Sequence, residues 1–419
     1  MTAFLLAVPL SAMAQKKDSA APIAWVQILP RGPAVRAITT TARCPDIRFN
    51  DRAESMTERA APDPDFQIRT CEAPLPAGTK RISIAGKPLA LPPERPRRIA
   101  VVGDTGCRMK LGNGLDYGFQ ACNVPAKWPF AKIAMQIANW KPDLIIHVGD
   151  YVYREQPCPA GNKGCAGSPI TGAGQRWATW QADWFKPAAP ILGAAPLVFI
   201  RGDHEDCSRA GPGWFRFLDP RPWQQCDDTT EPYAIDLAGL RLVIMDTVLA
   251  EDTALSPNNV RQLYTSQFDR ARELSQGRTW LLGHRPLWGL RPTDKAGAHV
   301  EPMNVTLQNA LSQGSGLSPE IELVLTGHIH LGEVISFKGG RPPQMVAGTG
   351  GTLMLPRVSA KLVGMEIDGA VVEDAAVLSR HGFFTFEPES KAWRVTFRDV
   401  DGVTRARCTL ENTSFACRQ

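Results

Sequence analysis

Five short polar motifs, each placed directly after an apolar run, constrain this 419-residue chain more than any other feature. Each motif combines a glycine with aspartate, histidine or tyrosine. In chain order they are Gly103-Asp104-Thr105-Gly106, Gly149-Asp150-Tyr151-Val152-Tyr153, Gly202-Asp203-His204-Glu205, Gly283-His284 and Gly327-His328-Ile329-His330. Because ligands gather beyond the carboxyl ends of the strands of an α/β sheet, these side chains are predicted to converge. Carboxylate, phenolate and imidazole donors without thiolate suit two adjacent metal ions.

The segments between the motifs alternate between strand and helix patterns. Buried strands are predicted at 99–102, 144–148, 197–200, 279–282 and 321–325, with further strands at 233–245, 333–337 and 344–347. Helices are predicted at 128–140, 177–185 and 260–274. We therefore expect an α/β fold, with a central β-sheet core and helices outside it.

Three segments are predicted along the chain. Residues 1–14 match an export signal, because an apolar run precedes the small-x-small sequence Ala12-Met13-Ala14, although they contain no Lys or Arg. Residues 15–96 contain short β-like runs and end in a proline-rich linker, which predicts a small β-rich N-terminal domain. Residues 97–419 carry all five motifs and include a C-terminal β-hairpin at about 376–419.

The ten cysteines indicate an oxidising compartment, so we expect a secreted or periplasmic protein. They fall into the neighbouring pairs Cys44/Cys71, Cys107/Cys122, Cys158/Cys165, Cys207/Cys226 and Cys408/Cys417. Connectivity is not fixed by sequence, and pairing of neighbours is the simplest arrangement. Thiolate metal ligands are the alternative, but the C-x-x-C spacing that they favour is absent.

The charge balance limits the expected partners. The chain has 47 Lys and Arg against 42 Asp and Glu, a net charge of +5, and no basic run stands out. This pattern does not indicate a nucleic-acid partner, whereas a mildly positive field favours anionic substrates. No stretch after the signal approaches the ~20 apolar residues of a membrane-spanning helix. Nothing in the sequence predicts the oligomeric state.

The ordered motifs resemble the calcineurin-like metallophosphoesterase superfamily over roughly residues 97–355. The spacing Gly149-Asp150-x-x-Tyr153 is similar to the purple acid phosphatase branch, in which a tyrosine at this place ligates ferric iron. The resemblance implies an αββα sandwich and two metal ions. Iron is expected at the Tyr153 site and zinc, iron or manganese at the second site, and calcium also suits oxygen-rich ligands.

The resemblance also implies a role for each motif residue. The first metal ion would be bound by Asp104, Asp150, Tyr153 and His330. The second would be bound by Asp150, Asp203, His284 and His328, so that Asp150 bridges the two ions. His204, oriented by Glu205, would contact the phosphoryl oxygens or protonate the leaving group. His299, in the loop 291–301, would face the substrate.

The implied reaction is hydrolysis of a phosphorylated small molecule, most simply a monoester, by a hydroxide held between the two ions. A phosphodiesterase or nucleotidase on the same fold is the alternative within this class. Gly106 takes the place of a histidine that the superfamily usually has, as in the purple acid phosphatases. Asp203 stands where the superfamily has asparagine, and its added negative charge repels an anionic substrate. A metal- or phosphate-binding protein that has lost turnover is therefore the second hypothesis.

Overall fold

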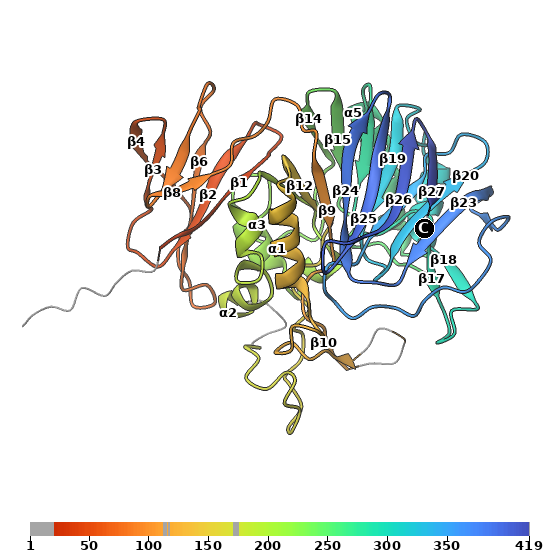
Figure 1. The fold of residues 1–419 in the computed structure, drawn as a ribbon, viewed down its shortest axis with the longest axis horizontal. Helices are drawn as coiled ribbons and strands as arrows, with labels where there is room; N and C mark the ends of the chain where they lie inside the picture. The colour runs from red at the N-terminus through yellow and green to blue at the C-terminus, as the bar shows by residue number, and fades with distance from the viewer. Residues whose placement is uncertain (1–20, 112–114, 116–117, 171–175, 419) are drawn as a thin grey trace, which may run out of the picture.

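Two mixed sheets packed face to face form the centre of the molecule, with helices on both outer faces (Figure 1). This arrangement comes from a computed structural model that describes residues 21–111, 115, 118–170 and 176–418. The expected α/β sandwich is confirmed. The predicted signal segment, residues 1–14, lies outside the described residues.

The first sheet has eleven described strands in the order β27-β26-β25-β24-β9-β12-β13-β1-β2-β6-β5. Its central strands β9 (Ile99–Val102), β12 (Leu144–His147) and β13 (Leu197–Phe199) are parallel and fully buried, as their apolar runs predict. The outer strands are β1 (Ile23–Gln27), β2 (Ala34–Thr39), β5 (Thr57–Ala60), β6 (Arg69–Pro74), β24 (Gly382–Glu389), β25 (Ala392–Asp399), β26 (Thr404–Glu411) and β27 (Ser414–Arg418).

The second sheet has eight described strands in the order β14-β15-β16-β19-β21-β20-β23-β22. They are β14 (Tyr233–Leu237), β15 (Leu240–Ile244), β16 (Thr279–Leu282), β19 (Ile321–Thr326), β20 (Gly332–Phe337), β21 (Gln344–Ala347), β22 (Glu366–Ile367) and β23 (Ala370–Leu378). Because β15, β16, β19 and β21 are parallel neighbours, the loops that follow them emerge at one edge.

Apolar side chains fill the space between the sheets and beneath the helices. The inner core combines residues from both sheets, such as Val101 and Ile146 with Leu242 and Leu325. The helices over the first sheet are α1 (Phe130–Trp140), α2 (Trp177–Trp180), the π-helix η1 (Gln181–Phe185), α3 (Ala189–Leu192) and α4 (Gly211–Phe217). Those over the second sheet are α5 (Asn258–Leu274) and α6 (Val305–Gln313). Each fully buried large apolar side chain stabilises the fold by about 1.5–3 kcal/mol.

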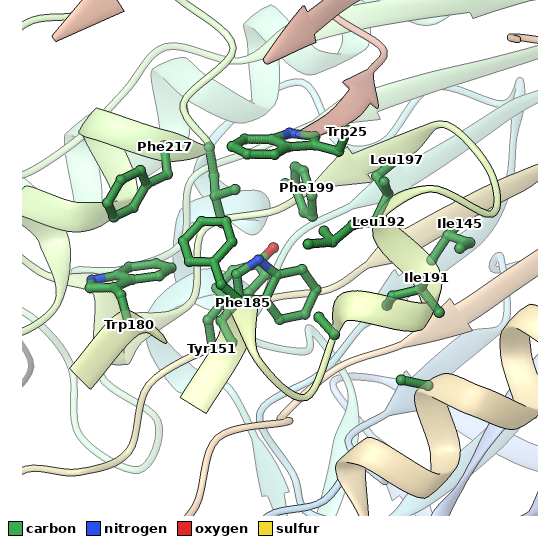
Figure 2. Close-up of a cluster of buried hydrophobic side chains, with 14 of the residues drawn as sticks. Trp25, Ile145, Tyr151, Trp180, Phe185, Ile191, Leu192, Leu197, Phe199 and Phe217 are labelled. Carbon is green, nitrogen blue, oxygen red and sulfur yellow. The ribbon is translucent and has the colours of Figure 1, made fainter. Parts of the chain in front are cut away.

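The N-terminal segment shares its sheet and its core with the rest of the chain. Strand β1 pairs in parallel with β13, and β2, β6 and β5 extend the same sheet outward (Figure 1). Trp25 from β1 packs against Phe185 at 5.6 Å between ring centroids, inside the cluster drawn in Figure 2. A separate β-rich sheet in this segment contains β3 (Asp46–Phe49), β4 (Arg52–Ser55), β7 (Ile82–Ile84) and β8 (Lys87–Leu89).

The C-terminal segment completes the first sheet. The hairpin expected there corresponds to β24 and β25, and β26 and β27 continue it as a meander whose first strand pairs with β9. Short hairpins near the motif loops are β10 (Met109–Lys110) with β11 (Gly118–Phe119) and β17 (Gly289–Pro292) with β18 (Val300–Met303). The five disulfides of the described residues join the neighbouring cysteines as predicted. Within the described ranges, no helix combines the length and apolar character needed to cross a bilayer.

Candidate metal centre

The predicted ligands lie in the loops that follow the parallel strands of both sheets. Asp104, Asp150 and Asp203 follow β9, β12 and β13, while His284 and His328 follow β16 and β19. Asp104, Asp150 and His328 have φ angles of 57°, 60° and 72°, a left-handed conformation that is uncommon outside glycine. Such strain is found where a functional arrangement requires it.

Two motif glycines are required by close approach. A Cβ atom on Gly202 would lie 2.1 Å from Asp150 Oδ1, and one on Gly149 would lie 2.4 Å from His284 Nδ1. Neither contact is sterically possible, so only glycine lets these loops meet. These two glycines are therefore part of the architecture of the site.

Four predicted ligands of the second metal ion form a tight group. Asp150, Asp203, His284 and His328 each offer one donor atom, and these atoms lie within 4.8 Å of one another. His284 Nε2 is 3.1 Å from both Asp150 Oδ2 and Asp203 Oδ1, and His328 Nδ1 is 2.8 Å from Asp203 Oδ1. We call these four residues the second cluster.

The histidines of the second cluster are oriented for metal binding. The other ring nitrogen of each is occupied: His284 Nδ1 lies 2.7 Å from the Val148 carbonyl oxygen, and His328 Nε2 lies 2.8 Å from Asp252 Oδ2. If these nitrogens donate, the remaining lone pairs face carboxylate oxygens, which is favourable only with a cation or a proton between them. Burial opposes protonation, yet Asp252 raises the pKa of His328 to about 9 and Asp150 raises that of His284. The donor set therefore fits a metal ion.

The first cluster, Asp104, Asp150, Tyr153 and His330, is centred on the tyrosine oxygen. Tyr153 Oη lies 2.8 Å from Asp104 Oδ1, 2.6 Å from Asp150 Oδ2 and 3.1 Å from His330 Nε2. One phenol hydrogen satisfies only one of three such acceptors at a time. His330 Nδ1 is occupied by the Leu353 carbonyl oxygen at 2.9 Å, so Nε2 is the nitrogen that faces the cluster. A cation at this place would satisfy all four groups.

The charges of the buried carboxylates differ between the clusters. Burial and the neighbouring Asp150 raise the pKa of Asp104 to about 7, against the opposing effect of His284. Burial also acts on Asp203, but Arg285 and His328 outweigh it and hold its pKa well below the usual range. Burial and the adjacent carboxylates raise the pKa of Tyr153 well above its usual value. The first cluster therefore binds protons readily when no metal ion is present.

A cavity of about 170 Å³ opens beside the ligands. Its lining contains the ligands Asp150, Asp203, His328 and His330, and also His204 and Asp252. Cationic side chains surround them, namely Arg108, Lys110, Arg209, Arg285 and Arg291. A positively charged wall around a small cavity attracts an anionic ligand and favours the more highly charged one.

His204 lies at the predicted position, but its orienting carboxylate differs from the expectation. Its ring packs 4.2 Å from the Tyr153 ring between centroids, and its Nδ1 contacts Glu155 Oε1. Glu205 instead accepts hydrogen bonds from the backbone N–H groups of Asp150, Tyr151, Val152 and Gly202. The structure does not pair Glu205 with the His204 ring as predicted, because four backbone donors, three from the Asp150 loop and one from Gly202, occupy the Glu205 carboxylate.

The structure does not bring His299 to the cavity. Its side chain is 82% exposed and pairs with Asp294 at 2.9 Å, beside the β17–β18 hairpin. His299 lies five positions after Asp294 in the chain, so a local turn contact explains its position.

Two site residues escaped the sequence reasoning. Glu155 contacts His204, and Asp252 contacts His328, Arg285 at 2.7 Å and Asn304 at 2.7 Å. Neither belongs to a glycine-containing motif. Asp252 lies in the loop after β15, a parallel strand. This position beyond the end of a strand is the one sequence feature that could have identified it as a site residue.

Comparison with known proteins identifies the family and similar folds. The family model described as calcineurin-like phosphoesterase matches residues 97–332, more than half of the chain. A purple acid phosphatase, PPD1 from yellow lupin (Lupinus luteus) seeds, is similar in fold, with a TM-score of 0.55, 13% identity, and 93% of this chain and 74% of that chain covered. The structure of PhoD is similar with a TM-score of 0.56, 12% identity, and 96% and 91% covered. A search of curated proteins found no match. The chain belongs to the calcineurin-like phosphoesterase family.

Proposed function

We propose that this protein is an exported phosphomonoesterase with a dinuclear metal centre. The observation that carries the proposal is that two ligand clusters share Asp150 and border one small, cation-lined cavity. Because a phosphomonoester is more negatively charged than a diester, such a lining favours the monoester. The disulfides are consistent with an oxidising compartment outside the cytoplasm.

Each ligand is assigned to the cluster that contains it. Asp104, Tyr153 and His330 would hold one metal ion, Asp203, His284 and His328 the other, and Asp150 both. When bound, the two ions supply Lewis acidity toward the phosphoryl oxygens and activate water. The phenol at Tyr153 favours iron in the first cluster, with zinc, iron or manganese in the second.

His204 is the proposed acid. If its Nδ1 hydrogen is held by Glu155, Nε2 is the atom that can donate a proton to the leaving oxygen or a hydrogen bond to the phosphoryl group. Burial would raise the pKa of Glu155, but His204 and Arg209 hold it below its usual range, so this carboxylate stays charged. Glu205 supports the site indirectly by fixing the backbone that carries Asp150.

The test is phosphate release from an aryl phosphate by the metal-loaded protein. His204→Ala should lower kcat by roughly 100- to 10,000-fold and leave two metal ions bound. His299→Ala makes the same substitution at an exposed histidine outside the cavity, so it is the matched control and should retain full activity. Unchanged turnover in His204→Ala would refute the assignment.

A second assay separates the monoesterase from the alternatives within the same fold. An aryl diester and a nucleotide are compared with the aryl monoester at equal concentration. Faster turnover of the diester would favour a phosphodiesterase. Tight phosphate binding without hydrolysis of any ester, over a range of pH and metal ions, would favour a binding protein that has lost turnover.

A further inference from the structure

The carboxylate of Asp203 is divided between two environments. Its Oδ1 atom faces the second cluster, 3.1 Å from His284 Nε2 and 2.8 Å from His328 Nδ1. Its Oδ2 atom lies close to two guanidinium groups: Arg285 Nη2 at 3.3 Å and Arg209 Nη2 at 3.4 Å. One oxygen is therefore available to a metal ion, while the other is held by cations.

The two arginines are fixed by other carboxylates. Arg285 Nη1 lies 2.7 Å from Asp252 Oδ2, and its side chain is 12% exposed. Arg209 Nε lies 2.6 Å from Asp206 Oδ2, and its Nη1 lies 3.1 Å from Glu155 Oε1. Because several contacts hold each guanidinium in place, neither would need to reorganise when Asp203 binds a metal ion.

An asparagine would not suit this position in this chain. A carboxamide has one acceptor end and one donor end. If its oxygen faced the second cluster, its NH₂ group would face two guanidiniums that are themselves only donors. If it were turned over, the NH₂ group would face the cluster, where a metal ligand needs a lone pair. In both orientations one side of the carboxamide is mismatched.

We propose that Arg209 and Arg285 are positioning residues that hold Asp203 as a one-oxygen metal ligand and compensate its charge, so that the three residues work as a unit. The inference rests on the proposed dinuclear centre. It removes the electrostatic reason for expecting an impaired enzyme, because the extra negative charge of Asp203 lies between two cations. It also predicts that Asp203→Asn weakens the site and does not improve it.

The test is a double-mutant cycle on metal binding. Protein prepared free of both metal ions is titrated with zinc by calorimetry. Asp203→Asn, Arg285→Met and Arg209→Met are examined singly, and each arginine variant is also combined with Asp203→Asn. Asp203→Asn should weaken one of two zinc sites by roughly 10- to 100-fold. Adding Arg285→Met or Arg209→Met should recover part of that loss, because the donor conflict disappears. Arg278→Met is the control, because it removes a guanidinium that lies just before β16 and pairs with Glu322 at 3.0 Å. It should leave zinc binding unchanged.

Two outcomes would overturn the inference. They are additive effects in both pairs, or an Asp203→Asn protein that binds zinc as tightly as the wild type. Thermal unfolding of each metal-free variant identifies any variant that fails to fold. If the variants with Arg285→Met do not fold, the cycle is completed with Arg209→Met, because the Arg209 side chain is 20% exposed. A wild type that binds two zinc ions but hydrolyses no ester would overturn the proposed function and leave this inference standing.

Discussion

The two ligand clusters share Asp150 but have different surroundings. Asp104 and Tyr153 are at most 1% exposed and are not among the residues that line the cavity. Asp203 and His328 line the cavity, and carboxylate and guanidinium groups surround them. The loops at the shared end of the two sheets thus place an enclosed pair, Asp104 and Tyr153, beside ligands that border the cavity. We expect the first cluster to retain its ion and the second to exchange it.

The largest effect is expected from the residue that belongs to both clusters. Asp150→Asn removes one negative charge from each site, so both ions should be lost and turnover should fall by at least about 1,000-fold. Elemental analysis and phosphate release measure the two effects. If the variant retained both ions, Asp150 would not be the bridge between the clusters.

Tyr153→Phe removes a hydroxyl that belongs to the enclosed cluster only. If iron is bound there, a phenolate ligand gives visible absorption, which should disappear in this variant while the ion of the second cluster stays bound. Turnover should fall by roughly 10- to 100-fold, the scale expected when the environment of a metal is disturbed. Tyr233→Phe is the matched control, because its hydroxyl contacts the Phe199 carbonyl oxygen and lies outside both clusters. A coloured Tyr153→Phe protein would exclude Tyr153 as the source of the colour.

Asp252→Asn tests the accessible cluster. The Asp252 carboxylate accepts a hydrogen bond from the His328 ring. Removing its charge should weaken zinc binding at the second cluster by roughly 10-fold and leave zinc binding at the first cluster unchanged. Asp294→Asn removes a carboxylate that pairs with the exposed His299 and serves as the control. Equal weakening of both zinc sites would show that the clusters are not separable in this way.

The smallest effect concerns the stability of the metal-free protein. Burial and Asp150 raise the pKa of Asp104 to about 7, above its value near 4 in the unfolded chain. Between these values the folded state binds more protons, so stability falls as pH rises from 4 to 7. Asp104→Asn should remove this pH-dependent loss of stability, and so stabilise the metal-free protein at pH 8 by on the order of 1–3 kcal/mol. Thermal unfolding at pH 5 and pH 8 checks it, and equal changes at both pH values would contradict it.

Asp203 has the opposite linkage and sharpens the contrast. Its pKa in the folded protein is depressed by Arg285 and His328, despite burial. Its contribution to stability is therefore present above the unfolded pKa near 4 and is lost as pH falls. Asp203→Asn should accordingly lower the unfolding temperature of the metal-free protein at pH 8, where Asp104→Asn raises it.

Much of the fold was predictable because local patterns and strand ends agree. The short, largely apolar runs that form β9, β12, β16 and β19 are almost entirely buried, and a predicted ligand follows each strand within three residues. The pairing of β1 with β13 was not predictable, because more than a hundred residues separate them and no local pattern encodes it. The partners of His204 and His328 were missed for a similar reason, since Glu155 and Asp252 act through contacts between distant loops.

The most direct test of the dinuclear account is the metal content of the purified protein after exposure to iron, zinc, manganese and calcium. The account predicts two ions per chain in the wild type, with one removed readily by a chelator and one retained. A single ion, or two that leave together, would contradict the division into an enclosed and an accessible site.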